Sequence, residues 1–216
     1  MSNSTGIGQT ALVAIDVQND FCPGGALAVE HGHEVVEPIN AMMPLFDVRV
    51  LTQDWHPVDH SSFASNHAGA DPFSKVEMEY GPQVLWPSHC VQETDGASFH
   101  SGLRTDLAGL IVRKGYRSAI DSYSAFMEND KSTTTGLAGY LRELDVRTVY
   151  FAGLATDFCV AWSAMDAVRN GFASRVILDA SRAIDLDGSL DAAMASMRDT
   201  GVEFVESSEI LAGTTE

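Results

Sequence analysis

The residue with the clearest chemical potential is Cys159, because it stands between a strand-like run and a helical pattern. Residues 148–152 are β-branched, aromatic or small with almost no polar alternation, which favours a strand covered on both faces. Apolar residues then recur at helical spacing over 160–168, before Asn170 and Gly171 provide a helix stop. The pattern therefore places Cys159 in the first turn of a helix, just after a buried strand.

The start of that helix would also affect the thiol. We expect Gly153 to end the strand and Thr156 or Asp157 to cap the helix. Unpaired amides and the helix dipole favour negative charge there, so the sequence predicts a Cys159 pKa below that of a free cysteine and a nucleophilic thiolate. A buried structural role is the alternative, since free cysteines commonly pack in cores. The choice depends on which other groups reach the sulfur.

Two such groups follow other strand-like runs. Asp16 closes the apolar run 10–15, and Lys114 follows the run 110–112. A cysteine nucleophile needs a group that takes its proton and a cation that stabilises the thiolate. We interpret Asp16 as the base and Lys114 as the cation. Backbone N–H groups of the turn 154–156 and of the helix start would hold an oxyanion, which indicates acyl transfer.

A second set of polar residues suits a metal ion. Asp54 and His56 follow a strand predicted at 48–52 and, being two residues apart in extended backbone, point the same way. With His89 they would supply two imidazoles and one carboxylate, which suit Zn²⁺, Fe²⁺ or Mn²⁺ and leave coordination positions free. These residues are therefore predicted ligands of one divalent ion, with zinc as the first choice and His60 and His67 as weaker candidate ligands. A histidine that is hydrogen-bonded rather than metal-bound is the alternative at each position.

Strand-like and helix-like segments alternate along the chain. Strands are predicted at 10–15, 48–52, 110–112, 148–152, 175–178 and 202–205, and helices at 31–46, 134–144, after 156 and at 189–200. This order predicts an α/β fold, an open parallel sheet of about six strands with helices on both faces. Ligands of such sheets bind outside the carboxyl ends of the strands, so the groups above should meet at one edge. The stretch from Pro57 to Asp106 is predicted to be a long functional loop.

Length and charge bound the kind of protein. The 216 residues fit a single domain, with 1–9 and 212–216 as flexible tails. A formal charge of −17 disfavours nucleic acid and anionic membrane surfaces as partners and favours a small molecule. The sequence shows neither a signal peptide nor an apolar run long enough for a membrane span, so we expect a cytoplasmic protein with its three cysteines reduced. The oligomeric state, monomer or homo-oligomer, stays open.

Longer motifs surround these residues, and together they identify a family. They are DVQNDFCPGGAL at Asp16, TQDWHPVDHSSFASNH at Asp54 and His56, LWPSHCV at His89, KG at Lys114, DSYSAF at Tyr123 and GLATDFCV at Cys159. On these motifs the chain resembles the nicotinamidases (pyrazinamidases) of the isochorismatase-like cysteine hydrolases, over almost its whole length. The resemblance implies a three-layer α/β/α fold and a role in NAD salvage.

The resemblance also implies roles for individual residues. Cys159 matches the family's nucleophile, Asp16 and Lys114 complete the triad, and Asp54, His56 and His89 hold the metal. A cis peptide before Ala155 is implied, with the Ala155 and Cys159 amides as the oxyanion hole. Phe21, Trp86 and Tyr123 would form an aromatic substrate pocket, although core packing is an alternative reading of all three.

The implied reaction is hydrolysis of nicotinamide, or of analogues such as pyrazinamide, to the acid and ammonia through a cysteine thioester. Relatives that hydrolyse other small amides, such as maleamate or N-carbamoyl compounds, are the first alternative, but as a family they lack the Asp-His-His metal set. An iron oxygenase with two histidines and one carboxylate is a second alternative, in which Cys159 and Lys114 would have no purpose. A non-catalytic ligand-binding protein is a third.

Overall fold

A six-stranded, fully parallel sheet forms the centre of the computed structural model, which describes residues 9–213. Its strands are β1 (Gln9–Ile15), β2 (Val48–Asp54), β5 (Leu110–Lys114), β6 (Val146–Leu154), β7 (Ala173–Arg182) and β8 (Glu203–Val205). The strand order is β5-β2-β1-β6-β7-β8, so the chain builds outward from β1 in one direction and then returns to the other side of it. The predicted open parallel sheet is confirmed.

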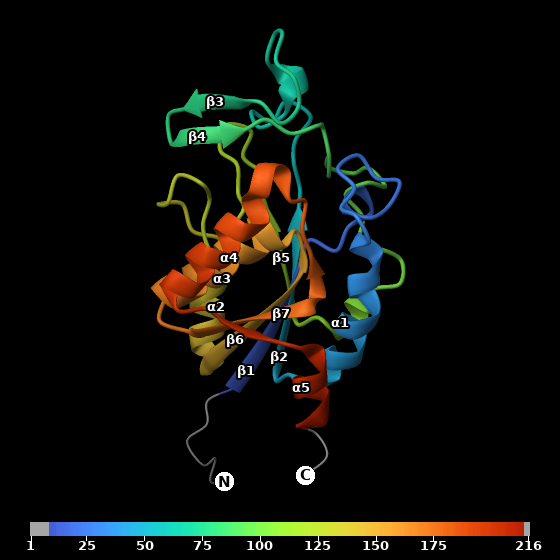
Figure 1. Cartoon of the computed structure of the whole chain (residues 1–216), viewed down its shortest axis with the longest axis vertical. Helices are drawn as coiled ribbons and strands as arrows, with labels where there is room; N and C mark the ends of the chain where they lie inside the picture. The colour runs from blue at the N-terminus through green and yellow to red at the C-terminus, as the bar shows by residue number, and fades with distance from the viewer. Residues whose placement is uncertain (1–8, 214–216) are drawn as a thin grey trace.

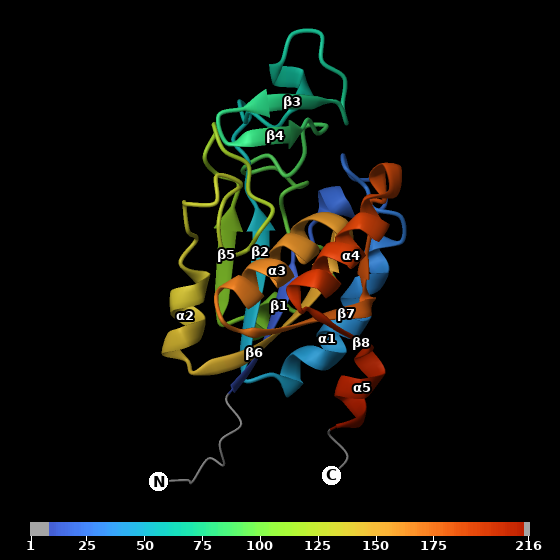
Figure 2. The same cartoon turned by 60° about the vertical axis from the view of Figure 1, so that its left-hand side comes forward.

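Helices cover both faces of the sheet, as predicted (Figure 1, Figure 2). One face carries α2 (Leu137–Glu143), α3 (Ala161–Arg169) and α4 (Ser189–Thr200), and the other carries α1 (Val36–Met42) and α5 (Ser207–Ala212). Side chains alternate along β1, so that Val13 and Ile15 enter the first core while Leu12 and Ala14 enter the second. Burial on both faces explains why the strand sequences are almost continuously apolar. None of the described helices has the length and apolarity that a membrane span requires.

The end of β6 differs from the sequence prediction. Gly153 does not terminate the strand, which continues to Leu154, and it pairs instead with Ile15 of β1. Its φ is 117°, and a Cβ at this position would lie 2.2 Å from the Ile15 carbonyl oxygen. Glycine is therefore required here for the close approach of two backbones, immediately before the turn that carries the cysteine.

The helix that follows β6 also begins differently. Neither Thr156 nor Asp157 caps it, because Ala155 occupies the cap position and no side chain bonds to the first turn. A π-helical turn spans Thr156–Val160, and α3 continues from it. Among the other helices, α4 matches its predicted range, whereas α2 begins three residues late because Gly136 adopts a left-handed φ of 93°.

The long segment between β2 and β5 contains structure that the sequence reading missed. A two-stranded antiparallel hairpin, β3 (Lys75–Met78) and β4 (Gly81–Val84), lies beyond the carboxyl ends of the sheet (Figure 1, Figure 2). Four-residue strands, one of which contains a proline, carry too little alternation to be recognised. Helix α5 was also missed. The predicted flexible tails lie outside the described residues, except for Gln9 in β1 and residues 212–213 at the end of α5.

Candidate active site

The carboxyl edge of the sheet brings together side chains from four strands or their ends. Lys114, the last residue of β5 and fully buried, lies at the centre. Its ammonium is 2.8 Å from Asp16 Oδ2, donates to Cys159 Sγ at 3.3 Å and also contacts a carboxylate oxygen of Asp54. The Ser122 carbonyl oxygen accepts a further bond from it at 2.9 Å. These groups lie where the strand order reverses, beside β1 and β6, which is the usual ligand position in such sheets.

Two buried carboxylates share this lysine but differ in electrostatics. Burial raises the pKa of Asp16, and neighbouring Asp54 adds to the rise against the opposing effect of Lys114. The pKa of Asp54 is instead held well below its usual range, against the cost of burial, by Lys114 and by its contacts with His56 and His89. When the surroundings shift the pKa values of two neighbouring groups in opposite directions, the two groups are suited to different chemical roles. Asp16 is therefore the carboxylate suited to accept and return a proton.

The thiol of Cys159 does not have the low pKa that the sequence predicted. Burial raises its pKa well above that of a free cysteine; Lys114 opposes this rise, and the carboxylates of Asp16 and Asp54 add to it. The amides at the helix start do not offset the cost of burying the thiolate, to which two carboxylates from other strands add. A raised pKa favours the protonated thiol, and a carboxylate oxygen of Asp16 lies within 4.8 Å of the sulfur.

Asp54, His56 and His89 form a compact group beside the cysteine. Asp54 Oδ2 lies 3.5 Å from His56 Nε2 and 3.8 Å from His89 Nε2. The opposite ring nitrogens are each 2.8 Å from a backbone carbonyl oxygen, that of Gly115 for His56 and that of Pro87 for His89. Donation from Nδ1 to a carbonyl leaves the Nε2 lone pairs directed at one point, the arrangement found around protein metal ions. The geometry fits a divalent cation.

His60 lies next to this group but is engaged elsewhere. Its Nδ1 accepts the Ser62 backbone N–H at 3.2 Å and lies 2.7 Å from the Ser62 hydroxyl, while Nε2 lies 3.3 Å from the Ile120 carbonyl oxygen. Burial and neighbouring His56 lower the pKa of His60 to about 4. Ligand atoms of His60, His56 and Asp121 do lie within 4.8 Å of one another, but both ring nitrogens of His60 already have partners.

A small cavity opens onto the cysteine. Phe21, Trp86 and Tyr123 all line it, together with Ala155 and the candidate metal ligands described above. Trp86 Nε1 donates to the Tyr123 hydroxyl at 3.2 Å, which fixes both rings. The peptide bond before Ala155 is cis, as the resemblance implies. The lining residues that sequence reasoning missed are Leu27, Asp121, Phe158 and Ile184.

Several residues that hold the site in place were also missed. Gln18 is fully buried and clamps the backbone of Asp54, donating to its carbonyl oxygen at 2.9 Å and accepting its N–H at 2.8 Å. Thr52 donates its hydroxyl proton to Asp16 Oδ1 at 2.6 Å. Both residues were visible as polar side chains within or beside apolar strand runs, where a buried polar group needs a partner.

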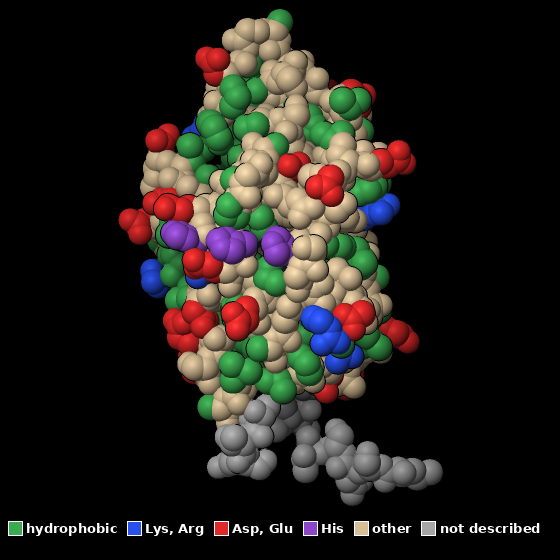
Figure 3. Space-filling model, turned by 90° about the vertical axis from the view of Figure 1, so that its right-hand side faces the viewer, with side chains coloured by type: hydrophobic (Ala, Val, Ile, Leu, Met, Phe, Trp, Pro, Cys, Tyr) green, Lys and Arg blue, Asp and Glu red, His purple; other side chains and the backbone are tan. Residues whose placement is uncertain are grey.

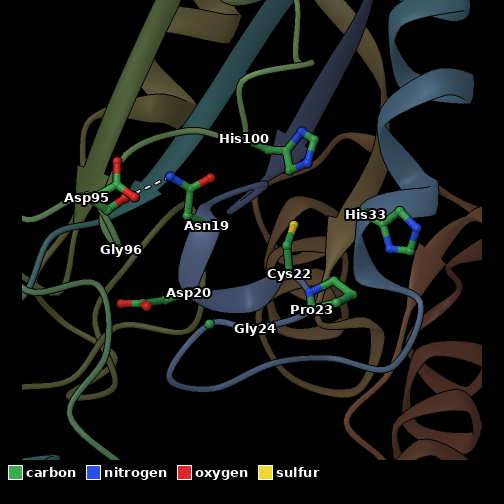
Figure 4. Close-up of a pocket in the computed structure, with 10 residues that line it drawn as sticks. Asn19, Asp20, Cys22, Pro23, Gly24, His33, Asp95, Gly96 and His100 are labelled. Carbon is green, nitrogen blue, oxygen red and sulfur yellow. Dashed lines mark hydrogen bonds between the residues drawn. The ribbon is translucent and has the colours of Figure 1, made fainter.

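A wide surface cleft lies on the outer side of the loop that carries Phe21. Figure 4 shows Cys22, His33 and His100 around it, with the Asn19 amide donating to the Asp95 carbonyl oxygen at 2.8 Å. None of the predicted triad or metal residues lines this cleft. The face in Figure 3 carries scattered acidic side chains, in keeping with the formal charge of −17, and also a row of histidines.

Comparison with known proteins places these features in context. Residues 10–209 match the family described as the isochorismatase domain. The chain is 55% identical to a nicotinamidase of Acinetobacter baylyi, over 93% of this chain and 94% of that one. A solved Acinetobacter baumanii nicotinamidase/pyrazinamidase superposes with a TM-score of 0.93 at 52% identity, covering 95% of this chain and all of that one. The Pyrococcus horikoshii pyrazinamidase, solved in complex with zinc, has a TM-score of 0.74 at 33% identity and covers 92% and 99%.

Proposed function

The chain belongs to the isochorismatase family, and from this premise we propose that it hydrolyses the carboxamide of nicotinamide, and of analogues such as pyrazinamide, to the carboxylate and ammonia. The observation that carries the proposal is the position of Cys159. Its sulfur lies within hydrogen-bond range of a buried lysine, beside a carboxylate of raised pKa, at a small cavity with aromatic walls. The aromatic side chains that line this cavity suit contact with the ring of a planar aromatic amide.

The first half of the reaction forms the acyl-enzyme. As the sulfur attacks the carboxamide carbon, the thiol proton moves to Asp16, so that the thiolate exists only during attack. Lys114 stabilises the charge that develops on the sulfur. The amides of Ala155 and Cys159 then hold the oxyanion of the tetrahedral intermediate. Asp16 returns its proton to the departing nitrogen, which leaves as ammonia, and a thioester to Cys159 remains.

The second half releases the acid. Asp16, ionised again after ammonia leaves, takes a proton from water as that water attacks the thioester carbonyl. The tetrahedral intermediate collapses, the C–S bond breaks, and the proton on Asp16 passes to the sulfur. Nicotinate leaves with the thiol restored. One carboxylate thus acts as base and acid in turn, which suits a group whose pKa burial has raised.

A divalent ion, with zinc as first choice and iron or manganese as alternatives, would be held by Asp54, His56 and His89. The carboxylate and the two oriented imidazoles fit such an ion on the geometry of their facing atoms. When bound, the ion supplies a Lewis-acidic site that takes the ring nitrogen of the substrate and so orients the carboxamide towards Cys159. His60 has no free ring nitrogen for this purpose.

Ammonia release from nicotinamide by the purified protein tests this function. Wild-type protein should release ammonia and nicotinate in equal amounts, and Cys159→Ala should release neither. Maleamate and an N-carbamoyl amino acid serve as comparison substrates, because they share the amide but lack the aromatic ring. Preferential turnover of either would assign the chain to another amide, and release of ammonia by Cys159→Ala would overturn the cysteine mechanism.

A further inference from the structure

The carboxylate of Asp157 is a buried group in the turn before the cysteine that the proposed reaction does not use. It is 4% exposed and lies two residues before Cys159. One oxygen accepts the Ile184 backbone N–H at 3.0 Å, and the other accepts the Asp185 N–H at 2.8 Å and the hydroxyl of Ser189. Ile184 and Asp185 belong to the connection between β7 and α4, and Ser189 is the first residue of α4, so the donors lie 27 to 32 residues further along the chain. Asp157 thus ties the turn that carries the nucleophile to a distant loop.

That connection, residues 183–188, depends on outside support for its shape. Asp185 and Asp187 both have left-handed backbone conformations, with φ of 53° and 51°, and Gly188 follows with φ of 81°. Non-glycine residues in this region cost conformational free energy and persist where the surroundings hold them. Two successive backbone N–H groups, of Ile184 and Asp185, point at one carboxylate, and without it they would lose their acceptor.

The loop matters because Ile184 lines the same cavity as Cys159 and Trp86. Ile184 is partly buried and packs against the apolar core on the α1 side of the sheet. We propose that Asp157 is a positioning residue that holds Ile184 as one wall of the substrate cavity, and that this wall determines how tightly the aromatic ring of the substrate is held. The proposal rests on the proposed function for the identity of that substrate.

The turn is suited to this task because it is itself well braced. The Ala155 carbonyl oxygen accepts both the Phe158 and the Val160 N–H at 3.1 Å. The turn therefore holds the sulfur of Cys159 and the carboxylate of Asp157 in a fixed relation. The hydrogen bonds of Asp157 in turn set the distance between the sulfur and Ile184. Just before the loop, Arg182 at the end of β7 pairs with Glu34 at 3.0 Å, but this pair is partly exposed and such a pair contributes little. The buried carboxylate is the main restraint.

Kinetics of three variants test the proposal. In Asp157→Asn, the amide group presents its own donors to the loop N–H groups, so the loop should loosen. The KM for nicotinamide should rise about tenfold, as expected when one apolar contact with a substrate is lost. The kcat should stay within about threefold, because the triad is intact. Ile184→Ala should raise KM similarly, and the double variant should be no worse than the worse single variant.

A readout that needs no turnover accompanies the kinetics. Hydrogen exchange of the amides in 183–189 should accelerate in Asp157→Asn and stay at wild-type rates elsewhere. Asp179→Asn is the matched control, since Asp179 likewise accepts a backbone N–H and a hydroxyl, both from Ser207, but at the start of α5, away from the cavity. It should leave KM, kcat and exchange in the loop unchanged. Should Asp157→Asn fail to fold, Ser189→Ala, which removes one of the three donors, takes its place.

Three results would overturn the proposal. The first is hydrogen exchange in the loop of Asp157→Asn at the wild-type rate. The second is faster exchange in that variant with an unchanged KM. The third is a double variant in which the effects of Asp157→Asn and Ile184→Ala on KM add in full. A fall in kcat alone would assign Asp157 to the nucleophile turn instead. Failure of wild-type protein to hydrolyse nicotinamide would overturn the proposed function, and the exchange pattern would still decide whether Asp157 holds the loop.

Discussion

Lys114 Nζ lies 2.8 Å from Asp16 Oδ2, and both side chains are fully buried. A buried ion pair of this kind is costly to desolvate and is kept together only by close contact. The sulfur of Cys159 lies 3.3 Å from the same ammonium, and in the proposed mechanism the pair takes part in the proton transfer. The first prediction follows from this contact.

Cys159→Ala and Asp16→Asn should each lower kcat by on the order of a thousandfold or more, and the double variant should cost little more than the worse single variant. The two residues act in one proton transfer, so losing either disables it. Circular dichroism and thermal melts should show that both single variants fold. Lys114→Ala should also lose stability, because it leaves the carboxylates of Asp16 and Asp54 buried without their cation. Near wild-type turnover by Cys159→Ala would refute the mechanism.

The raised pKa of Cys159 predicts slow alkylation at neutral pH. Iodoacetamide should modify Cys159 more slowly than a free thiol at pH 7, and the rate should rise as the pH increases towards the raised pKa. Asp16→Asn should accelerate alkylation at neutral pH, because it removes a carboxylate that raises the pKa of the thiol. Mass spectrometry of the peptide that contains Cys159 measures this, with those of Cys22 and Cys90 as internal references. Slower alkylation in Asp16→Asn would mean that Asp16 already holds the thiol proton at rest.

The lowered pKa of His60 predicts a loss of stability in acid. In the unfolded chain His60 binds a proton near pH 6.5, whereas in the folded protein it does so only near pH 4. Between these values the unfolded state binds more protons, so the free energy of unfolding falls as the pH falls, by up to about 3 kcal/mol from this residue. Denaturant titrations of chelator-treated protein at pH 8 and pH 4.5 measure the change.

His60→Gln should reduce that change between the two pH values, whatever its effect at pH 8. Comparing each protein with itself at the two pH values removes the cost of the hydrogen bonds to Ser62 and Ile120 that the substitution alters. An equally steep loss of stability in wild type and variant would assign the acid sensitivity to other groups.

The candidate metal ligands Asp54, His56 and His89 predict that the enzyme prefers amides whose aromatic ring contains a nitrogen atom. If the ion binds the ring nitrogen, it stabilises the bound substrate and the transition state by similar amounts. Its effect should therefore appear mainly in KM. Benzamide, which lacks that nitrogen, should be a much poorer substrate than nicotinamide, and pyrazinamide should be accepted. Removing the metal with a chelator should make nicotinamide a poorer substrate and leave benzamide unaffected, so the difference between the two should become smaller. Equal turnover of benzamide and nicotinamide by the metal-loaded protein would exclude the anchoring role.

Local sequence determined the parallel sheet and the gathering of reactive groups at one edge. Runs such as 10–15 and 148–152 are apolar because both faces of their strands are buried, and parallel strands end at a common edge. A polar residue at the end of such a run is therefore placed by topology alone. The placement of Asp16, Lys114 and Cys159 at this edge therefore follows from the sequence pattern.

Tertiary structure decided what depends on groups from distant parts of the chain. The pKa of Cys159 is raised mainly because the folded chain buries the thiol, and the carboxylates of Asp16, just after β1, and Asp54 of β2 add to the rise; no pattern near the cysteine carries that information. Gly153 looks like a strand end in sequence, yet it is required by the approach of the β1 backbone. Asp157 looks like a helix cap, yet its partners lie on a loop far along the chain. Residue spacing encodes periodicity and strand ends, whereas electrostatics and close contacts arise only when separate segments meet.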